Sequence, residues 1–405
     1  MDVRITEKKI ILYEAFLIRI IVLMCIVLLA DILPAYGFIG NTPLYDDFRY
    51  EEGAVLYSKK ADSLIDVKTF TKVYESMDDR VGYHLDNPFT GVYLWYWIAC
   101  ILIYITKWRW SLRLLNIIFM TFTIKYVYEI TEYTYGNRAA KIAAKAMAFL
   151  PYLVIFSCFS YKECLVSFCT FYMWRYIVKR KHNVICKNRE TLQLIVCIFA
   201  MLFVRSGLSV ILIVTVFGYY YLDRLKNKIS FQNIMLMLLV ALLILLLLYK
   251  FRNIIIYKYM AYIGGDFSDE VLKGGRLVMI RRPQDIWKLP IAFVFAILNP
   301  IRTGGAIQSW SNVVGWLNIT LCPIAVGASL SFLKVHKPDK IQFWIMMGYY
   351  FISVISSIFI FRQLFSLLPI PIMSFAGYYA QSDFTRKKLV IMLSFFLTVM
   401  VLVAF

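Results

Sequence analysis

The chain has 405 residues, of which 61% are apolar and 17% are charged, and its formal net charge is +19. Because a soluble domain carries about 25% charged residues, this composition excludes a soluble globular protein and predicts an integral membrane protein. The positive charge fits the excess of Lys and Arg in cytoplasmic loops better than a nucleic-acid surface, since no basic segment lies in a soluble domain. The eight cysteines lie nearly all in or beside apolar blocks, so we expect neither disulfides nor metal ligands among them. The three histidines are far apart in the sequence, so we expect no histidine-based metal site.

Apolar blocks long enough to cross a bilayer, about 20 residues of helix, recur along the chain. The first block follows a charged N-terminus and is longer than the apolar core of a signal peptide, about 7–15 residues, so we expect it to be an anchoring helix. Backbone polar groups inside lipid must be paired within their own segment, so the predicted fold class is all-α. The expected spans are 10–36, 110–130, 142–159, 164–178, 191–204, 208–222, 231–249, 311–333, 341–360, 365–381 and 388–405.

A further apolar piece, residues 92–106, ends at Lys107-Trp108-Arg109-Trp110. If this piece does not cross the membrane, the basic clusters that follow the other spans all fall on the same side as Lys8 and Lys9. If it crosses, those clusters move outside, against the usual distribution of Lys and Arg. We therefore predict an interfacial or re-entrant helix at 92–106, and a single transmembrane domain over residues 1–405 with about 11 spans and a cytoplasmic N-terminus.

Two long loops, at 37–109 and 250–310, then face outside. Loops longer than about 12–15 residues are usually functional or disordered, and the aromatic and apolar content of these two favours ordered structure. The second loop is basic, and its charges are either solvated or form a surface for phosphate, because guanidinium groups bind oxyanions through paired hydrogen bonds. Its arginines include Arg276, Arg281 and Arg282.

Acidic residues occur at two places on the predicted outer side. The first loop contains Asp46-Asp47-Phe48-Arg49-Tyr50-Glu51-Glu52, and Tyr161-Lys162-Glu163 lies between two spans. Acidic pairs in loops are commonly only solvated, and a Lys-Glu pair can simply end two helices. At the membrane–water boundary, however, a carboxylate can act as a general base on a hydroxyl group.

Two arginines interrupt apolar blocks on the same predicted side. Arg205 breaks the stretch 192–221, and Arg362 precedes Pro369 and Pro371. A charge at membrane depth costs about 2.5–3.5 kcal/mol and commonly has a function. The alternatives are snorkelling of Arg205 to the interface and a simple helix-end charge at Arg362. The predicted topology, which uses none of these charged groups, places both arginines on the face that carries Asp46 and Glu163.

The order of these elements over residues 1–381 resembles that of GT-C glycosyltransferases, especially the polyprenyl-phosphate-dependent branch with protein O-mannosyltransferases and lipid A aminoarabinose transferases. The acidic motif that begins at Asp46-Asp47 is followed by a Pro-containing aromatic segment, an Arg-Leu-Leu-Asn helix start and a short basic turn. Glu163 resembles a later family acid. Arg205 stands where the family usually has Lys, which leaves the donor sugar and the acceptor open. The matching segments are 87–93, 111–116, 136–144, 205–207 and 362–371.

The resemblance implies transfer of a sugar or oligosaccharide from a polyprenyl phosphate or pyrophosphate carrier to an acceptor hydroxyl at the outer face of the cytoplasmic membrane. Asp46 would take the proton, and Asp47 and Glu163 would bind polar groups of the substrates. Arg205, Arg362 and one or more of Arg276, Arg281 and Arg282 would hold the departing phosphate.

The implied partners are the lipid-linked donor and a glycan or lipid-linked acceptor, in the assembly of a cell-surface polysaccharide or glycoconjugate. Asp46 and Glu163 leave a divalent metal such as Mg or Mn open but do not alone establish one, and no other cofactor is implied. An oligosaccharide repeat-unit polymerase is a near alternative. A transporter or flippase of lipid-linked sugars is a second one, although its typical paired interruptions in both halves of the chain are not evident.

Overall fold

The structure is a computed structural model that describes residues 2–32, 46–77, 93–204, 317–333 and 365–404. Within these ranges the regular elements are helices with no strand among them, which confirms the predicted all-α fold class. The helices are α1 (Asp2–Ile32), α2 (Asp46–Lys60), α3 (Val67–Met77), α5 (Tyr93–Thr106), α6 (Ser111–Tyr135), α7 (Asn137–Phe149), α8 (Pro151–Phe156), α9 (Glu163–Lys181), α10 (Asn188–Val204), the 3-10 helix η3 (Leu317–Leu321), α17 (Cys322–Leu333), α20 (Pro369–Gln381) and α21 (Phe384–Ala404).

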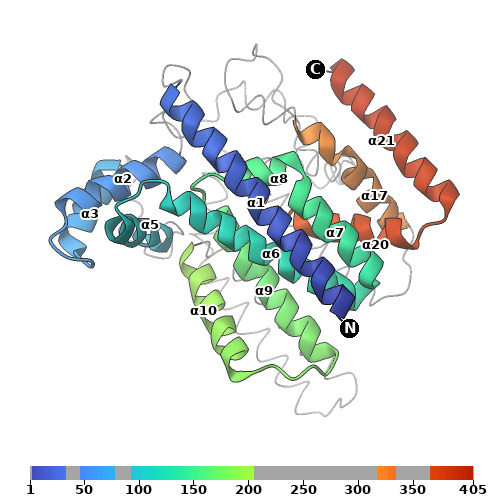
Figure 1. Cartoon of the computed structure of the whole chain (residues 1–405), viewed down its shortest axis with the longest axis horizontal. Coiled ribbons are helices and arrows are strands. Elements are labelled where there is room, and N and C mark those ends of the chain that lie inside the picture. The colour runs from blue at the N-terminus through green and yellow to red at the C-terminus, as the bar shows by residue number, and fades with distance from the viewer. Residues whose placement is uncertain (1, 33–45, 78–92, 205–316, 334–364, 405) are drawn as a thin grey trace, which may run out of the picture.

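Helix α6 lies at the centre of the described structure and packs against α1, α7 and α9. Helix α10 packs on α9, while α20 packs on α7 and α17, and α21 packs on α17. Helices α2, α3 and α5 form a separate group that projects to one side of the long helices, with α2 packed against both α3 and α5 (Figure 1). We call this group the side layer. It contains all the described residues of the predicted first loop up to Thr106.

By length and composition, two of the described helices are apolar enough to cross a membrane, at Thr6–Leu28 and Ser111–Tyr135. Leu94–Thr106 and Ile319–Ser331 are apolar but shorter. The predicted continuous span 142–159 is instead divided into α7 and α8, because Pro151 lacks a backbone N–H and cannot continue α7. The predicted spans 208–222, 231–249 and 341–360, and the second long loop, lie outside the described residues.

Helix α1 carries large apolar side chains on an exposed face as well as on its buried face. Its buried residues follow one another at intervals of one helical turn and are Ile11, Ala15, Arg19, Leu23 and Ile26. The exposed apolar residues show the same spacing and are Ile10, Tyr13, Leu17, Ile21, Met24 and Leu28. A soluble monomer rarely exposes a contiguous apolar surface of this kind, so the exposed stripe indicates a face that meets an apolar environment.

Arg19 lies fully buried in the middle of α1 and holds the break between α7 and α8. Its Nη2 donates to the carbonyl of Met147 at 2.8 Å, and its Nη1 donates to the carbonyl of Ala148 at 3.1 Å. In an uninterrupted helix the Met147 carbonyl would accept from the N–H of residue 151, but that residue is Pro151. Arg19 therefore supplies the donor that proline lacks. Its Nε also donates to Ser157 Oγ at 3.0 Å, where α8 ends.

Candidate functional site

A buried ion pair between Glu51 of α2 and Arg113 of α6 joins the side layer to the central helices. Arg113 Nε lies 2.5 Å from Glu51 Oε1, and Nη2 donates to Oε2 at 3.1 Å. Both side chains are fully buried. The paired hydrogen bonds match the planar fork of a guanidinium to a carboxylate. Because taking each ion out of water costs several kcal/mol, such a pair needs further hydrogen bonds to be stable.

Several further groups surround this pair. Ser160 Oγ donates a hydrogen bond to Glu51 Oε1, and Arg109 Nε donates to Oε2 at 3.4 Å. Arg109 Nη1 also pairs with Glu52 Oε1 at 2.6 Å. The ring of Trp110 lies 4.4 Å from the guanidinium carbon of Arg113, within the range of a cation–π contact. We call Glu51, Glu52, Arg109, Arg113 and Ser160 the charged cluster.

The backbone around Ser160 is held by side chains from two other helices. Trp95 of α5 donates from its indole nitrogen to the Ser160 carbonyl at 2.9 Å. Asn116 of α6 donates from Nδ2 to the carbonyls of Phe159 and Tyr161 at 2.6 and 2.8 Å. These bonds satisfy carbonyl groups in the turn between α8 and α9. They thereby fix the turn that leads to Glu163 against α5 and α6.

The local sequence explains why two arginines meet at one end of α6. Helix α5 ends at Thr106, and Lys107 adopts a left-handed backbone with a φ of 53° that turns the chain. The N–H of Ser111 donates to the Trp108 carbonyl at 3.2 Å, and the N–H of Arg113 donates to the Trp110 carbonyl at 3.1 Å. This turn brings Arg109 close enough to the first turn of α6 for both Arg109 and Arg113 to reach Glu51.

The predicted acids lie on the chain segments that carry members of the charged cluster. Asp46 and Asp47 are the first two residues of α2, and Asp47 lies one helical turn before Glu51. Glu163 is the first residue of α9, is only 2% exposed, and follows the turn that contains Ser160. The Glu51–Ser160 hydrogen bond thus links the helix that begins with the acidic motif to the turn that ends at Glu163. The predicted phosphate ligands Arg205, Arg276, Arg281, Arg282 and Arg362 lie outside the described residues.

The members of the charged cluster were not among the predicted site residues. Glu51 and Arg113 each lay within a quoted motif, and Arg109 lay in the basic end of the 92–106 piece. The available signal was that Arg113 is a single charge in the first turn of a long apolar block, where a charge needs a partner. The identity of that partner follows only from the fold. Ser160 carries no recognisable signal in the sequence.

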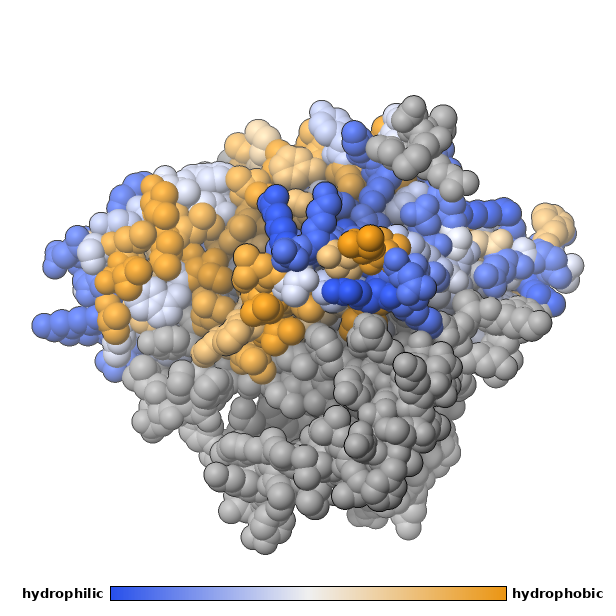
Figure 2. Space-filling model, turned by 90° about the horizontal axis from the view of Figure 1, so that it is seen from below, coloured by the Kyte–Doolittle hydropathy of each residue, from blue (hydrophilic) through white to orange (hydrophobic). Residues whose placement is uncertain are grey.

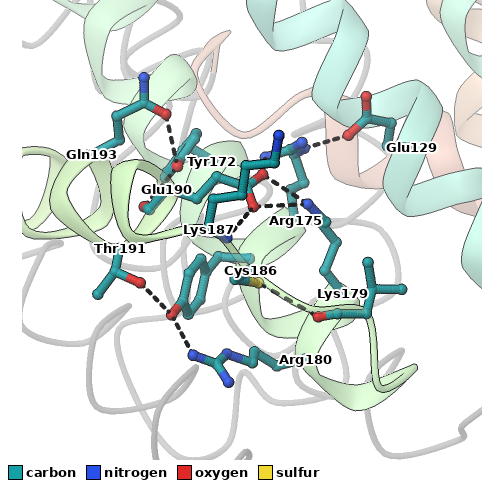
Figure 3. A network of polar contacts seen from close by, with 12 residues as sticks. Glu129, Tyr172, Arg175, Lys179, Arg180, Cys186, Lys187, Glu190, Thr191 and Gln193 are labelled. Carbon is teal, nitrogen blue, oxygen red and sulfur yellow. Dashed lines mark hydrogen bonds and ion pairs between the residues drawn. The ribbon is translucent and has the colours of Figure 1, made fainter.

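A second polar network lies at the opposite end of α6, about 24 Å from Arg113 by the helical rise over 16 residues. Glu129 of α6 pairs with Arg175 of α9 and, at 2.5 Å, with Lys8 of α1. Glu190 of α10 binds Arg175 at 3.0 Å and Lys179 at 2.7 Å (Figure 3). Side chains from four helices therefore meet in this network, which closes that end of the bundle.

In the described part of the chain, no three His, Cys, Asp or Glu side chains gather in a way that would hold a metal ion. The charged cluster instead offers one carboxylate held by cations, a second carboxylate at its edge and a partly exposed arginine that pairs with both. Such an arrangement suits the binding of an anionic or polyhydroxylated group. No family model, curated protein or solved structure matches this chain.

Proposed function

We propose that the chain is a polytopic membrane protein in which the charged cluster faces outside and the N-terminus is cytoplasmic. The apolar stripe of α1 supports this placement, because it would otherwise lie against water. Helices α10 and α21 likewise expose apolar residues, among them Phe199, Phe395 and Phe396. The network of Lys8, Arg175 and Lys179 at the other end of the bundle agrees with the enrichment of basic residues on the cytoplasmic side.

A native cysteine tests this topology. Cys186 is partly buried and lies in the turn between α9 and α10, next to the basic network. We expect a membrane-impermeant maleimide to leave Cys186 unlabelled in intact cells and to label it after permeabilisation. A Cys186→Ser variant identifies the labelled site. Labelling of Cys186 in intact cells would place α9 in the opposite orientation and show that residues 92–106 cross the membrane.

We further propose that the protein transfers a sugar or oligosaccharide from a polyprenyl phosphate or pyrophosphate carrier to an acceptor hydroxyl, at the outer end of α6. One observation carries this proposal. Glu51 binds both Arg113 and Ser160, and so fixes α2 against the turn that precedes α9. The helix starts that carry Asp46 and Glu163 therefore belong to one connected assembly beside Arg109, which is partly exposed.

In this proposal each group has a chemical role. Asp46 takes the proton from the acceptor hydroxyl as the oxygen attacks the anomeric carbon, and Asp47 and Glu163 orient substrate hydroxyls. Negative charge then grows on the departing carrier phosphate. Arg109, together with the predicted ligands Arg205 and Arg362, stabilises this charge, and fixed cations do so best where water is partly excluded. Glu51 and Arg113 hold the framework and do not touch the reacting atoms.

Asp46→Asn is expected to lower sugar transfer by about 10²–10⁴-fold, because a carboxamide cannot accept the proton. The measurement is mass analysis of the lipid-linked sugars that accumulate in cells lacking the protein, followed by complementation with each variant. The size of the accumulated species distinguishes transfer of one sugar from transfer of a repeat unit. The matched control is Asp62→Asn, an exposed aspartate in the turn after α2 that should retain full transfer. Undiminished transfer by Asp46→Asn would remove Asp46 from the mechanism.

A further inference from the structure

The outer edge of the side layer exposes large apolar side chains in two turns. In the α2–α3 turn Ile65 is 66% exposed and Val67 is 58% exposed. In the α5–α6 turn Ile105 is 64% exposed and Trp108 is 44% exposed. With Leu64, which is also exposed, these residues form what we call the apolar tip. Figure 2 shows apolar and hydrophilic side chains interspersed at the left of the view, the side on which Figure 1 places the side layer.

The two turns belong to one surface, because Tyr57 connects them. Its ring packs edge-on against Tyr104, the residue before Ile105, with ring centres 6.3 Å apart. Its hydroxyl donates to the Leu64 carbonyl at 3.1 Å and accepts from the N–H of Asp66 at 2.9 Å. Nζ of Lys107 also lies 3.4 Å from Ser58 Oγ. The end of α2 and the end of α5 are thus joined directly.

The apolar tip is built on ordered structure. Asp66 caps α3 by accepting a hydrogen bond from the N–H of Thr69 at 3.0 Å, and this bond lowers the pKa of the Asp66 carboxyl. Behind the turn, Phe70 stacks on Trp97 with ring centres 3.9 Å apart. Burial raises the pKa of the Tyr57 hydroxyl, which keeps it protonated as a donor. The interior of the side layer is therefore filled by aromatic residues such as Phe70 and Trp97. The exposure of Ile65 follows from this ordered turn.

The surroundings of the apolar tip are basic. Arg109 in the α5–α6 turn is paired with Glu51 and Glu52. The other charged residues in or beside the two turns are four exposed lysines (Lys59, Lys60, Lys68 and Lys107) and two aspartates (Asp62 and Asp66), which together carry a net charge of +2. Lysine stems with apolar neighbours and a nearby tryptophan suit the boundary between lipid headgroups and acyl chains. Lys107 also lies 4.0 Å from the centre of the Tyr104 ring.

We propose that the apolar tip inserts into the headgroup region of the outer leaflet, with its lysines against the phosphates of anionic lipids. The side layer would then lie on the membrane beside the bundle and be anchored at its outer edge. A lipid surface is favoured over a protein partner because Trp108 is three residues before Ser111, where the membrane-length helix α6 begins. Tryptophan is enriched at that depth. This inference rests on the proposed membrane placement of α6 and is independent of the transferase chemistry.

The test places a nitroxide spin label at Ile65 in the full-length protein, in vesicles of phosphatidylcholine with or without phosphatidylglycerol. Cys25 and Cys186, the two cysteines that are not buried, are first replaced by Ser, and Ile65→Cys is then labelled. Collision with oxygen, which concentrates in lipid, is compared with collision with a water-soluble nickel chelate. We expect oxygen to dominate at Ile65 and the nickel chelate to dominate at Glu75→Cys, an exposed position near the other end of α3.

A label on native Cys25, in the Cys186→Ser variant, is the reference for α1. Lipid exposure at Cys25 with water exposure at Ile65 would overturn the apolar-tip proposal alone, and water exposure at both would overturn the membrane placement itself. Shielding of Ile65 from both reagents would indicate a protein partner or a second copy of the chain and would also overturn it. If the label at Glu75→Cys lay as deep in the membrane as the label at Ile65→Cys, the proposal that only the apolar tip inserts would be wrong.

The lysines are tested separately by Lys59→Gln, Lys60→Gln and Lys107→Gln in one variant. We expect the label at Ile65 to become shallower in this variant only when phosphatidylglycerol is present. If the Ile65 label in the protein with all its lysines lay equally deep with and without phosphatidylglycerol, the lysines would have no role in binding anionic lipid phosphates.

Discussion

Glu51→Gln is expected to destabilise the protein by about 3–5 kcal/mol, because it leaves the buried guanidinium of Arg113 without its carboxylate. The glutamine keeps one acceptor oxygen but presents an NH2 group in place of the other, so the paired hydrogen bonds at 2.5 and 3.1 Å cannot both form. The measurement is unfolding in mixed detergent micelles, followed by tryptophan fluorescence as the fraction of sodium dodecyl sulfate rises. We also expect the loss to separate α2 from the turn that precedes α9.

A double-mutant cycle distinguishes this ion pair from simple packing. Replacing both partners, with Glu51→Met and Arg113→Met, removes both buried charges and should be much less destabilising than the sum of the single changes. Glu52→Gln is the matched control. Its carboxylate pairs with Arg109, and both side chains are about 30% exposed, so its loss should change stability by less than about 1 kcal/mol. Additive effects at Glu51 and Arg113 would contradict the proposed coupling.

Arg19→Leu is expected to destabilise the protein by about 2–4 kcal/mol, since a buried carbonyl without a donor costs about 1–3 kcal/mol. The carbonyls of Met147 and Ala148 and the Ser157 hydroxyl would each lose the hydrogen bond that Arg19 donates. The same unfolding measurement applies. Because the guanidinium compensates for the N–H that Pro151 lacks, the effect should depend on that proline.

Pro151→Ala in the Arg19→Leu background provides the decisive comparison. Alanine restores an N–H that can donate to the Met147 carbonyl and continue the helix, so the double variant should be more stable than Arg19→Leu alone. In the wild-type background Pro151→Ala should give no comparable gain, because Arg19 already occupies that carbonyl. A double variant that is no more stable than Arg19→Leu would show that Arg19 acts in some other way.

Much of the described fold was predictable from the lengths of apolar runs. The positions of α1, α6, α9 and α10 follow from apolar blocks bounded by charged turns. The division between α7 and α8 was missed, although Pro151 is a helix-breaking signal within the block 142–159. The role of Arg19 could not be predicted from the first apolar block, because it depends on a turn that lies far along the chain.

The candidate site was predictable only in outline. The sequence indicated that the acidic motif of the first loop and Glu163 belong to one region, because both were assigned to the same side by the distribution of basic residues. It could not indicate that Glu51, rather than its neighbours Asp46 and Asp47, is the buried partner of Arg113. The two residues are 62 positions apart, and no local pattern encodes that pairing. The roles of Asp46, Asp47 and Glu163 in transfer stay predictions.

The hydrogen bonds of Arg19 also constrain how the chain is made. Its partners on α7 and α8 lie 128 to 138 residues later, so at 5–20 residues per second they leave the ribosome about 6–28 s after Arg19. Under the proposed membrane placement, α1 must enter the bilayer while its guanidinium still lacks these acceptors, at a cost of about 2.5–3.5 kcal/mol. Each leucine, isoleucine, valine or phenylalanine offsets roughly 0.3–0.6 kcal/mol of that cost. The long apolar run within Thr6–Leu28 therefore allows the nascent helix to insert before the partners of Arg19 have been synthesised.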